Sequence, residues 1–229
     1  MEDIIRAIAH IHTDFASKFG VPRQSGLVEA LKGTIIFEPE YRNPDALRGI
    51  EGFSHIWLIW KFSETSREIW SPTVRPPRLG GSERMGVFAT RSPFRPNAIG
   101  LSSMRLCGVQ LHSEQGPVLL VAGADLMDKT PIYDIKPYLP YADSHPEAIG
   151  GFASSRPEAK LEVDFPVRLI ELVPDALREA LVGVLANDPR PSYQDDPERI
   201  YGFGFGGLNI KFRADARTLT VCDVQIPHA

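Results

Sequence analysis

The chain has 229 residues, of which 43% are apolar and 24% are charged, so its composition is that of a globular protein. Its formal net charge of -4 argues against a protein that coats nucleic acid through general electrostatics. No apolar run approaches the roughly 18 residues of a membrane span, the N-terminus lacks a secretory pattern, and two cysteines are too few for a disulfide framework. We therefore expect a cytoplasmic protein with no membrane segment.

Six segments of the first part of the chain have the apolar patterns of β-strands. They cover residues 4–11, 33–37, 55–62, 85–90, 99–109 and 118–126. Only a short helical turn is expected between them, at 43–47, with Asn43 as its N-cap and Pro44 in its first position. Strands joined without helices indicate an antiparallel sheet or barrel, so we predict a mainly β fold and no Rossmann fold.

The composition changes after Pro140, where Gly, Ser, Pro and Ala become frequent. Residues 143–160 are therefore predicted to form a linker between a β-barrel domain, 1–142, and a small α+β domain, 161–229. In the second domain, 161–172 has a strand-like pattern, 174–185 has helical spacing, and 201–224 supplies two or three strands.

Three patterns suggest chemistry but fail on their context. Gly202, Gly204 and Gly207 form a G-x-G-x-x-G, yet too few residues follow for a dinucleotide-binding unit. His10 and His12 share one face of a predicted strand without a partnering carboxylate or cysteine, so no metal site is predicted. A G-x-S-x-G hydrolase motif does not occur in the sequence.

The strongest signal is the segment RPPRLGGSERMGVFATRSPFRPNAIGLS, residues 75–102. It combines prolines, glycines and guanidinium groups suited to phosphate or carboxylate recognition. A second signal is DLMDKTPIYDIKPYLP, residues 125–140, where acids at 125, 128 and 134 leave a strand and enter a turn stiffened by proline. The alternative for both is a set of ordered β-loops with exposed charges, although loops of this length usually carry function.

These two segments resemble the TsaA-like (TrmO) family of tRNA methyltransferases. The resemblance extends to VPRQSGLV at 21–28, RGIEGFSHIWLIW at 48–60 and DPRPSY at 188–193, and so covers most of the chain. It implies a β-barrel enzyme that acts as a homodimer, binds S-adenosylmethionine near the subunit interface, and methylates N6 of N6-threonylcarbamoyladenosine at position 37 of tRNA. The chain departs from the family pattern at Ala98, at Lys129, which replaces a glycine, and at HTDF, which replaces SPY.

The resemblance also indicates site residues. It places in the cofactor site Thr13, Asp14, Phe15, Ser54, His55, Arg78, Arg91, Asp125, Leu126, Met127 and Asp128. Asp125 or Asp128 is expected either to accept the proton of the methylated nitrogen or to hold the ribose and amino group of the cofactor. For Ser54 and His55, capping of the following strand is the alternative role.

The DPRPSY segment is predicted to reach the anticodon loop of tRNA. Asp188, Arg190 and Tyr193 offer an acceptor for base edges, a guanidinium group and a stacking ring within six residues. The alternative is an Asp-Pro turn that only docks the two domains. For the whole chain, the alternative to an enzyme is a non-catalytic module that binds a nucleoside or S-adenosylmethionine.

Overall fold

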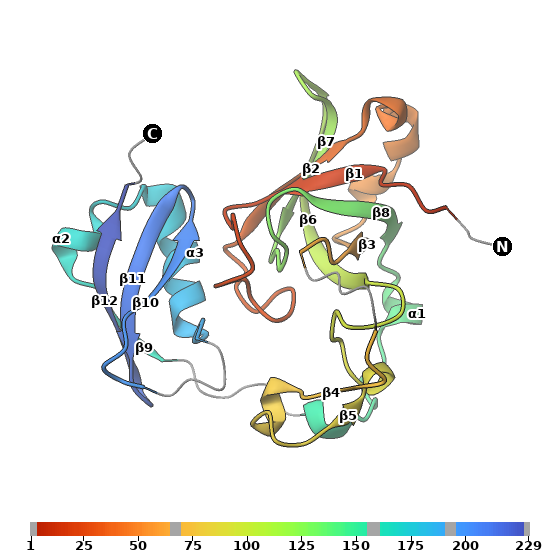
Figure 1. Ribbon diagram of the computed structural model, residues 1–229. Helices are drawn as coiled ribbons and strands as arrows, with labels where there is room; N and C mark the ends of the chain where they lie inside the picture. The colour runs from red at the N-terminus through yellow and green to blue at the C-terminus, as the bar shows by residue number, and fades with distance from the viewer. Residues whose placement is uncertain (1–3, 65–69, 155–160, 191–195, 227–229) are drawn as a thin grey trace.

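A computed structural model describes residues 4–64, 70–154, 161–190 and 196–226, without the side chain of Arg78. Six of its strands close into a barrel in the order β1-β2-β7-β6-β3-β8, and every neighbouring pair is antiparallel (Figure 1). Their bounds are Ala9–His12 (β1), Lys32–Phe37 (β2), His55–Lys61 (β3), Ile99–Ser113 (β6), Gly116–Ala122 (β7) and Thr130–Pro137 (β8). The predicted mainly β fold with an antiparallel barrel is confirmed, and the described residues form no parallel βαβ sheet of the Rossmann kind.

The alternation of side chains along β3 shows why this segment belongs to a barrel. Ile56, Leu58 and Trp60 are buried, whereas the residues between them are only partly covered. Their side chains point to the same face because successive residues of a strand alternate. Together with apolar side chains of the other strands they form the barrel core.

Two predicted strands are much shorter in the structure, and one strand of the barrel was not predicted. Residues 4–8 precede β1, and the segment 85–90 contains only β5 (Met85–Gly86) before the 3-10 helix η5 (Val87–Ala89). In contrast, β8 forms where a turn was predicted. Its prolines, Pro131 and Pro137, lie near its two ends, where a strand tolerates them best.

The long connection between β3 and β6 leaves the barrel and carries most of the arginine-rich segment. In it, β4 (Thr73–Val74) pairs with β5, and η4 (Pro77–Leu79) lies between them in the chain. Figure 1 shows this excursion in yellow, beside the barrel. The remaining short elements are the 3-10 helices η1 (Pro39–Tyr41), η2 (Pro44–Leu47), η3 (Ile50–Gly52) and η6 (Gly151–Ala153), and the helix α1 (Pro140–Asp143). The predicted cap of η2 is present, since Asn43 accepts a hydrogen bond from the Asp45 amide (3.0 Å).

The second sheet has the order β10-β11-β12-β9, and two helices belong to the same part of the chain. Its elements are β9 (Glu162–Asp164), α2 (Val167–Ile170), α3 (Asp175–Ala186), β10 (Tyr201–Phe205), β11 (Leu208–Ala214) and β12 (Thr218–Gln225). The predicted helix and three C-terminal strands are confirmed. The predicted strand 161–172 is wrong beyond Asp164, because Pro166 caps a helical turn there and its fixed φ favours a helix start.

The second hydrophobic core is not confined to residues 161–229. Phe15, Val28 and Leu31, all from the first part of the chain, are buried with the side chains of α3 and the second sheet. The rings of Phe15 and Phe205 meet edge to face with centroids 5.2 Å apart, and the Gly206 amide donates to the Asp14 carbonyl (2.8 Å). The two hydrophobic cores therefore do not coincide with the predicted division of the chain at residue 161.

Among the helices of the described ranges, none has the length and apolar character that crossing a membrane requires.

Candidate functional site

A cavity of about 480 Å³ lies where four segments of the chain meet at one end of the barrel. These segments are the loop after β1, the end of β3 with the residues that follow it, the arginine-rich connection with the start of β6, and the turn before β8. Its lining comprises Lys18, Val21, Pro22, Arg23, Gln24, Trp60, Lys61, Phe62, Ser63, Glu64, Thr90, Arg91, Pro93, Arg95, Ile99, Gly100, Leu101, Asp125, Leu126, Met127 and Thr130. The two segments with the strongest sequence signals thus face one space.

Asp125 is the group of this cavity with the most unusual environment. Burial raises its pKa to about 6, although a hydrogen bond with the Ser102 side chain and the charge of Arg91 lower it. Its Oδ1 is buried and has no hydrogen-bond partner among the described residues. Buried polar atoms in native proteins usually have a partner, so this oxygen is placed to accept a hydrogen bond from a ligand.

A short chain of polar contacts supports Asp125 from the barrel wall. Trp60 Nε1 donates to Ser102 Oγ (3.1 Å), and both residues are buried. The indole ring lies against Gly100 so closely that a Cβ on that residue would stand 2.3 Å from it. Glycine at position 100 therefore leaves room for the ring, which lines the cavity and reaches Ser102.

Asp128, the second predicted catalytic carboxylate, is used differently. Its Oδ1 accepts from the Thr13 amide (3.2 Å) and lies 3.0 Å from His12 Nδ1. Thr13 also donates through Oγ1 to the Leu126 carbonyl (2.9 Å). Asp128 thus ties the end of β1 to the turn before β8, and it does not line the cavity.

The neighbouring positions of the predicted set have mixed roles. Burial, and to a lesser extent the charge of Asp128, raises the pKa of Asp14 above its ordinary value. Phe15 packs in the second hydrophobic core, so its ring stabilises the fold. Leu126 and Met127, which were predicted to contact the cofactor, line the cavity, and Leu126 also belongs to the barrel core.

Arg91 and the Ser-His pair are separated by the fold. Arg91 lines the cavity, and its guanidinium donates to Oε1 of Gln24, which also lines it. Ser54 and His55 lie at the other end of β3. With the usual rise per residue of a strand, His55 is about 20 Å from Lys61, which lines the cavity. There Ser54 Oγ and His55 Nδ1 are 2.9 Å apart, so the two side chains contact each other. The side chain of Arg78 is outside the described part of the chain.

Arg190 has a structural role within the second sheet. It is only 8% exposed, and its guanidinium donates to both carboxylate oxygens of Asp188 (2.8 and 2.9 Å). It also donates to the carbonyls of Ala214 (2.8 Å), the last residue of β11, and Asp215 (3.1 Å), the next residue. The geometry thus favours the alternative of a docking turn over the predicted anticodon contact. The turn is bound to the connection between β11 and β12, whereas the alternative had it join the two domains. Tyr193 lies outside the described residues.

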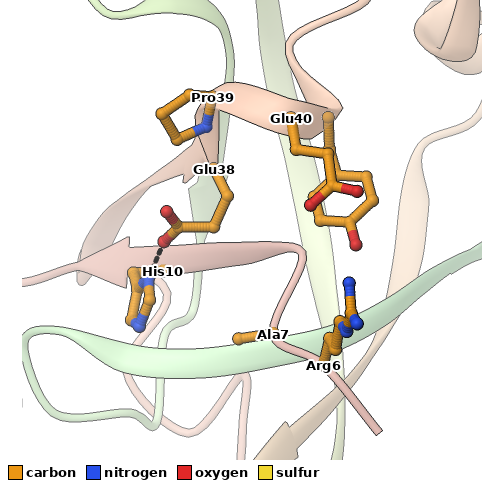
Figure 2. A pocket seen from close by; sticks show the side chains of 7 residues that line it. Arg6, Ala7, His10, Glu38, Pro39 and Glu40 are labelled. Atoms are coloured by element: carbon orange, nitrogen blue, oxygen red, sulfur yellow. Dashed lines mark ion pairs between the residues drawn. The ribbon is translucent and has the colours of Figure 1, made fainter.

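A second hollow, of about 550 Å³, lies beside β1 and η1 and is shown in Figure 2. It has seven lining residues, compared with twenty-one for the first cavity, and none is a predicted site residue. His10 Nδ1 and Glu38 Oε1 are 2.6 Å apart there, so these two groups pair with each other. Within the described ranges, no group of three His, Cys, Asp or Glu side chains is arranged to hold a metal ion. Asp125 and its unpartnered oxygen make the first cavity the candidate site.

Sequence reasoning missed much of the cavity wall. Lys18 and the segment 21–24 come from a loop that carries no chemical motif by itself, although VPRQ belongs to the family resemblance. Trp60 and Phe62 looked like ordinary residues of a buried strand. Closure of the barrel brings these positions next to Asp125 and Arg91.

Two family models match this chain, one in each part. Residues 10–144 match the tRNA-methyltransferase O N-terminal domain, and residues 158–226 match the TrmO C-terminal domain. The chain is 42% identical over 214 residues to the tRNA (adenine(37)-N6)-methyltransferase of Escherichia coli K12, covering 90% of this chain and 91% of that protein. It is 45% identical over 164 residues to the enzyme of the same name from Eikenella corrodens, covering 71% of this chain and 92% of that protein.

A solved structure shares the whole architecture. The crystal structure of TrmO from Pseudomonas aeruginosa superposes with a TM-score of 0.78 at 33% identity, and the match covers 98% of this chain and 100% of that one. Both domain matches and both levels of identity lead to one conclusion. The chain belongs to the tRNA-methyltransferase O (TrmO) family.

Proposed function

We propose that this chain is a tRNA (adenine37-N6)-methyltransferase that uses S-adenosylmethionine, and that its acceptor is the N6 of N6-threonylcarbamoyladenosine. The relatives named above carry the first part of this function in their names. The observation that carries the proposal for the site is the unpartnered, buried oxygen of Asp125 in a cavity that also contains Arg91. A small, cytoplasmic homodimer is the setting that we infer for the reaction.

The side chains that line the cavity fit S-adenosylmethionine in their charges and in their apolar and aromatic surface. An arginine such as Arg91 binds a carboxylate, and an acid such as Asp125 accepts from an ammonium group or a ribose hydroxyl. Trp60, Phe62 and Leu101 add apolar and aromatic surface on which an adenine ring can lie. When bound, S-adenosylmethionine supplies a methyl group on a sulfonium centre.

Asp125 is the residue that we place closest to the chemistry. Since its pKa is about 6, it is mostly ionised at neutral pH but remains basic enough to take a proton from an acceptor nitrogen. Ser102, held by Trp60, keeps the carboxylate oriented. The other walls hold the acceptor in place and exclude water, and positioning provides most of the rate in such a transfer.

A direct test is methylation of tRNA by the purified protein. Nucleoside mass spectrometry should detect an N6-methylated product when tRNA carrying threonylcarbamoyladenosine is incubated with the protein and S-adenosylmethionine. tRNA that lacks the threonylcarbamoyl group should give much less product. Methylation of neither tRNA would reject the activity, and equal methylation of both would reject the threonylcarbamoyl part.

Matched variants test the site. Asp125→Asn should lose cofactor binding or turnover, whereas Asp128→Asn, whose carboxylate is turned toward Thr13 and His12, should retain most of the turnover per folded molecule. The dimer is tested by light scattering, which should give twice the chain mass of 25.4 kDa.

A further inference from the structure

Two aromatic rings of the arginine-rich excursion are exposed side by side. Trp70 is 45% exposed and Phe88 is 73% exposed. Their rings stack with centroids 6.3 Å apart and planes inclined by 26°. Exposure of large aromatic surface is unfavourable in water, so a paired exposed surface of this kind marks a site of interaction. We call this pair the aromatic platform.

The backbone around the aromatic platform is well fixed. Phe88 lies in η5, whose first residue, Val87, is buried and donates its amide to the Pro72 carbonyl (3.0 Å). The pairing of β4 with β5 and the hydrogen bond from the Ser71 amide to the Phe94 carbonyl (3.4 Å) hold the strand that follows Trp70. The two rings are therefore presented before any partner arrives.

The charge around the platform favours an anionic partner. Residues 70–97 contain five arginines and one glutamate, a sum of +4, in a chain whose total is -4, so all other residues together sum to -8. Among the described side chains, none of Arg75, Arg84, Arg91 and Arg95 forms a salt bridge with a carboxylate. A polyanion is thus attracted to this excursion and repelled by most of the remaining surface.

The platform also adjoins the candidate active site. Thr90 and Arg91, which line the cavity, follow Phe88 by two and three residues. A chain of nucleotides with one base in the cavity therefore has its neighbouring bases within reach of the rings. Unstacked bases of RNA loops are commonly bound by stacking on aromatic side chains, with arginines at the phosphates.

We propose that Trp70 and Phe88 stack with unpaired bases of an RNA loop next to the methylated adenine, while the surrounding arginines contact its phosphates. This inference rests on the proposed function, because it assumes an RNA substrate. It makes the excursion, rather than Arg190, the principal RNA contact among the described residues. Trp70 and Phe88 act as positioning residues.

The experiment compares binding of an anticodon stem-loop RNA with binding of a fully paired duplex of the same length. Trp70→Ala and Phe88→Ala should each weaken stem-loop binding about 5- to 100-fold, the range expected for loss of one base-stacking contact. Duplex binding and S-adenosylmethionine binding should stay within about twofold of the wild type, because neither uses the rings. Trp70→Phe should restore most of the stem-loop affinity. Tyr141→Ala, which removes a ring that is 87% exposed on α1, is the matched control and should have no effect.

Tryptophan fluorescence gives a second readout. The stem-loop should quench the emission of the wild type more strongly than that of Trp70→Phe, in which only Trp57 and the cavity residue Trp60, both on β3, remain to respond. Unchanged stem-loop affinity in both alanine variants would overturn the inference. A change of the Trp70→Ala, Phe88→Ala double variant from dimer to monomer would assign the platform to a second copy of the chain instead. If the wild type methylates tRNA in either case, the proposed function survives and only the platform fails.

Discussion

The pKa of Asp125 predicts that one substitution stabilises the protein while it removes activity. The folded-state pKa of about 6 exceeds the ordinary value of 3.8. At any pH above both pKa values, burial of the charged carboxylate therefore costs about 3 kcal/mol of stability. The folded protein binds this proton more tightly than the unfolded chain does. Stability contributed by this group is therefore complete below about pH 4 and is lost as the pH rises through about 6.

Asp125→Asn cannot ionise and so avoids this cost. Compared with the wild type, the variant should gain up to about 3 kcal/mol in the free energy of unfolding at about pH 8, and the gain should shrink toward zero at about pH 4. The gain is an upper value, because the neutral amide loses the attraction of Arg91 and must keep the contact with Ser102. Turnover should fall by at least about 100-fold, as expected for loss of an essential proton acceptor.

Urea denaturation of both proteins at a series of pH values measures the difference directly. Asp128→Asn is the control, because its side-chain oxygen can still accept from the Thr13 amide while the charge beside His12 Nδ1 is removed, so it should bring no gain in stability. The reasoning about Asp125 is refuted if Asp125→Asn is less stable than the wild type at about pH 8. A stability difference that does not vary with pH would refute it equally.

Two further predictions concern the backbone and the second sheet. Arg190→Ala should lower the free energy of unfolding by about 3 kcal/mol, because it leaves two backbone carbonyls and the Asp188 carboxylate without their donor. Arg190→Lys should recover only part of this loss. Thermal denaturation measures both variants, and a stable Arg190→Ala variant with impaired RNA binding would support the anticodon contact instead. Lys129→Gly should raise the free energy of unfolding by about 1 kcal/mol, because Lys129 has a left-handed φ of 61° that glycine adopts without strain. Lys129→Ala should bring no gain. Equal melting temperatures for the wild type and both variants would contradict this prediction.

The fold was predictable where side-chain alternation is strong. The segment containing Ile56, Leu58 and Trp60 indicates a buried strand, and closure of several such strands follows from the absence of helices between them. β8 was missed because Pro131 and Pro137 suggested a turn, although both lie near strand ends. The sequence also gives no sign that Phe15 packs against Phe205, since that contact joins positions far apart in the chain.

The site was predictable only in part. Asp125 and Arg91 were found through motifs that resemble a known family, and the structure brings them into one cavity. Asp128 and Arg190 belong to equally suggestive motifs, but local hydrogen bonds use their charged groups for the fold. Trp60 was not predicted, because its role depends on the close approach of Gly100 from the neighbouring strand.

The loop after β1 has two different neighbours, and this has a thermodynamic consequence. Phe19 and Val28 pack against the core of the second sheet, whereas Lys18 and residues 21–24 form a wall of the cavity. A displacement of the second sheet by bound RNA would move that wall and change the affinity for the cofactor. By linkage, the cofactor would then change the affinity for RNA by the same factor, so that the packing of a single loop would set the strength of the coupling between the two ligands.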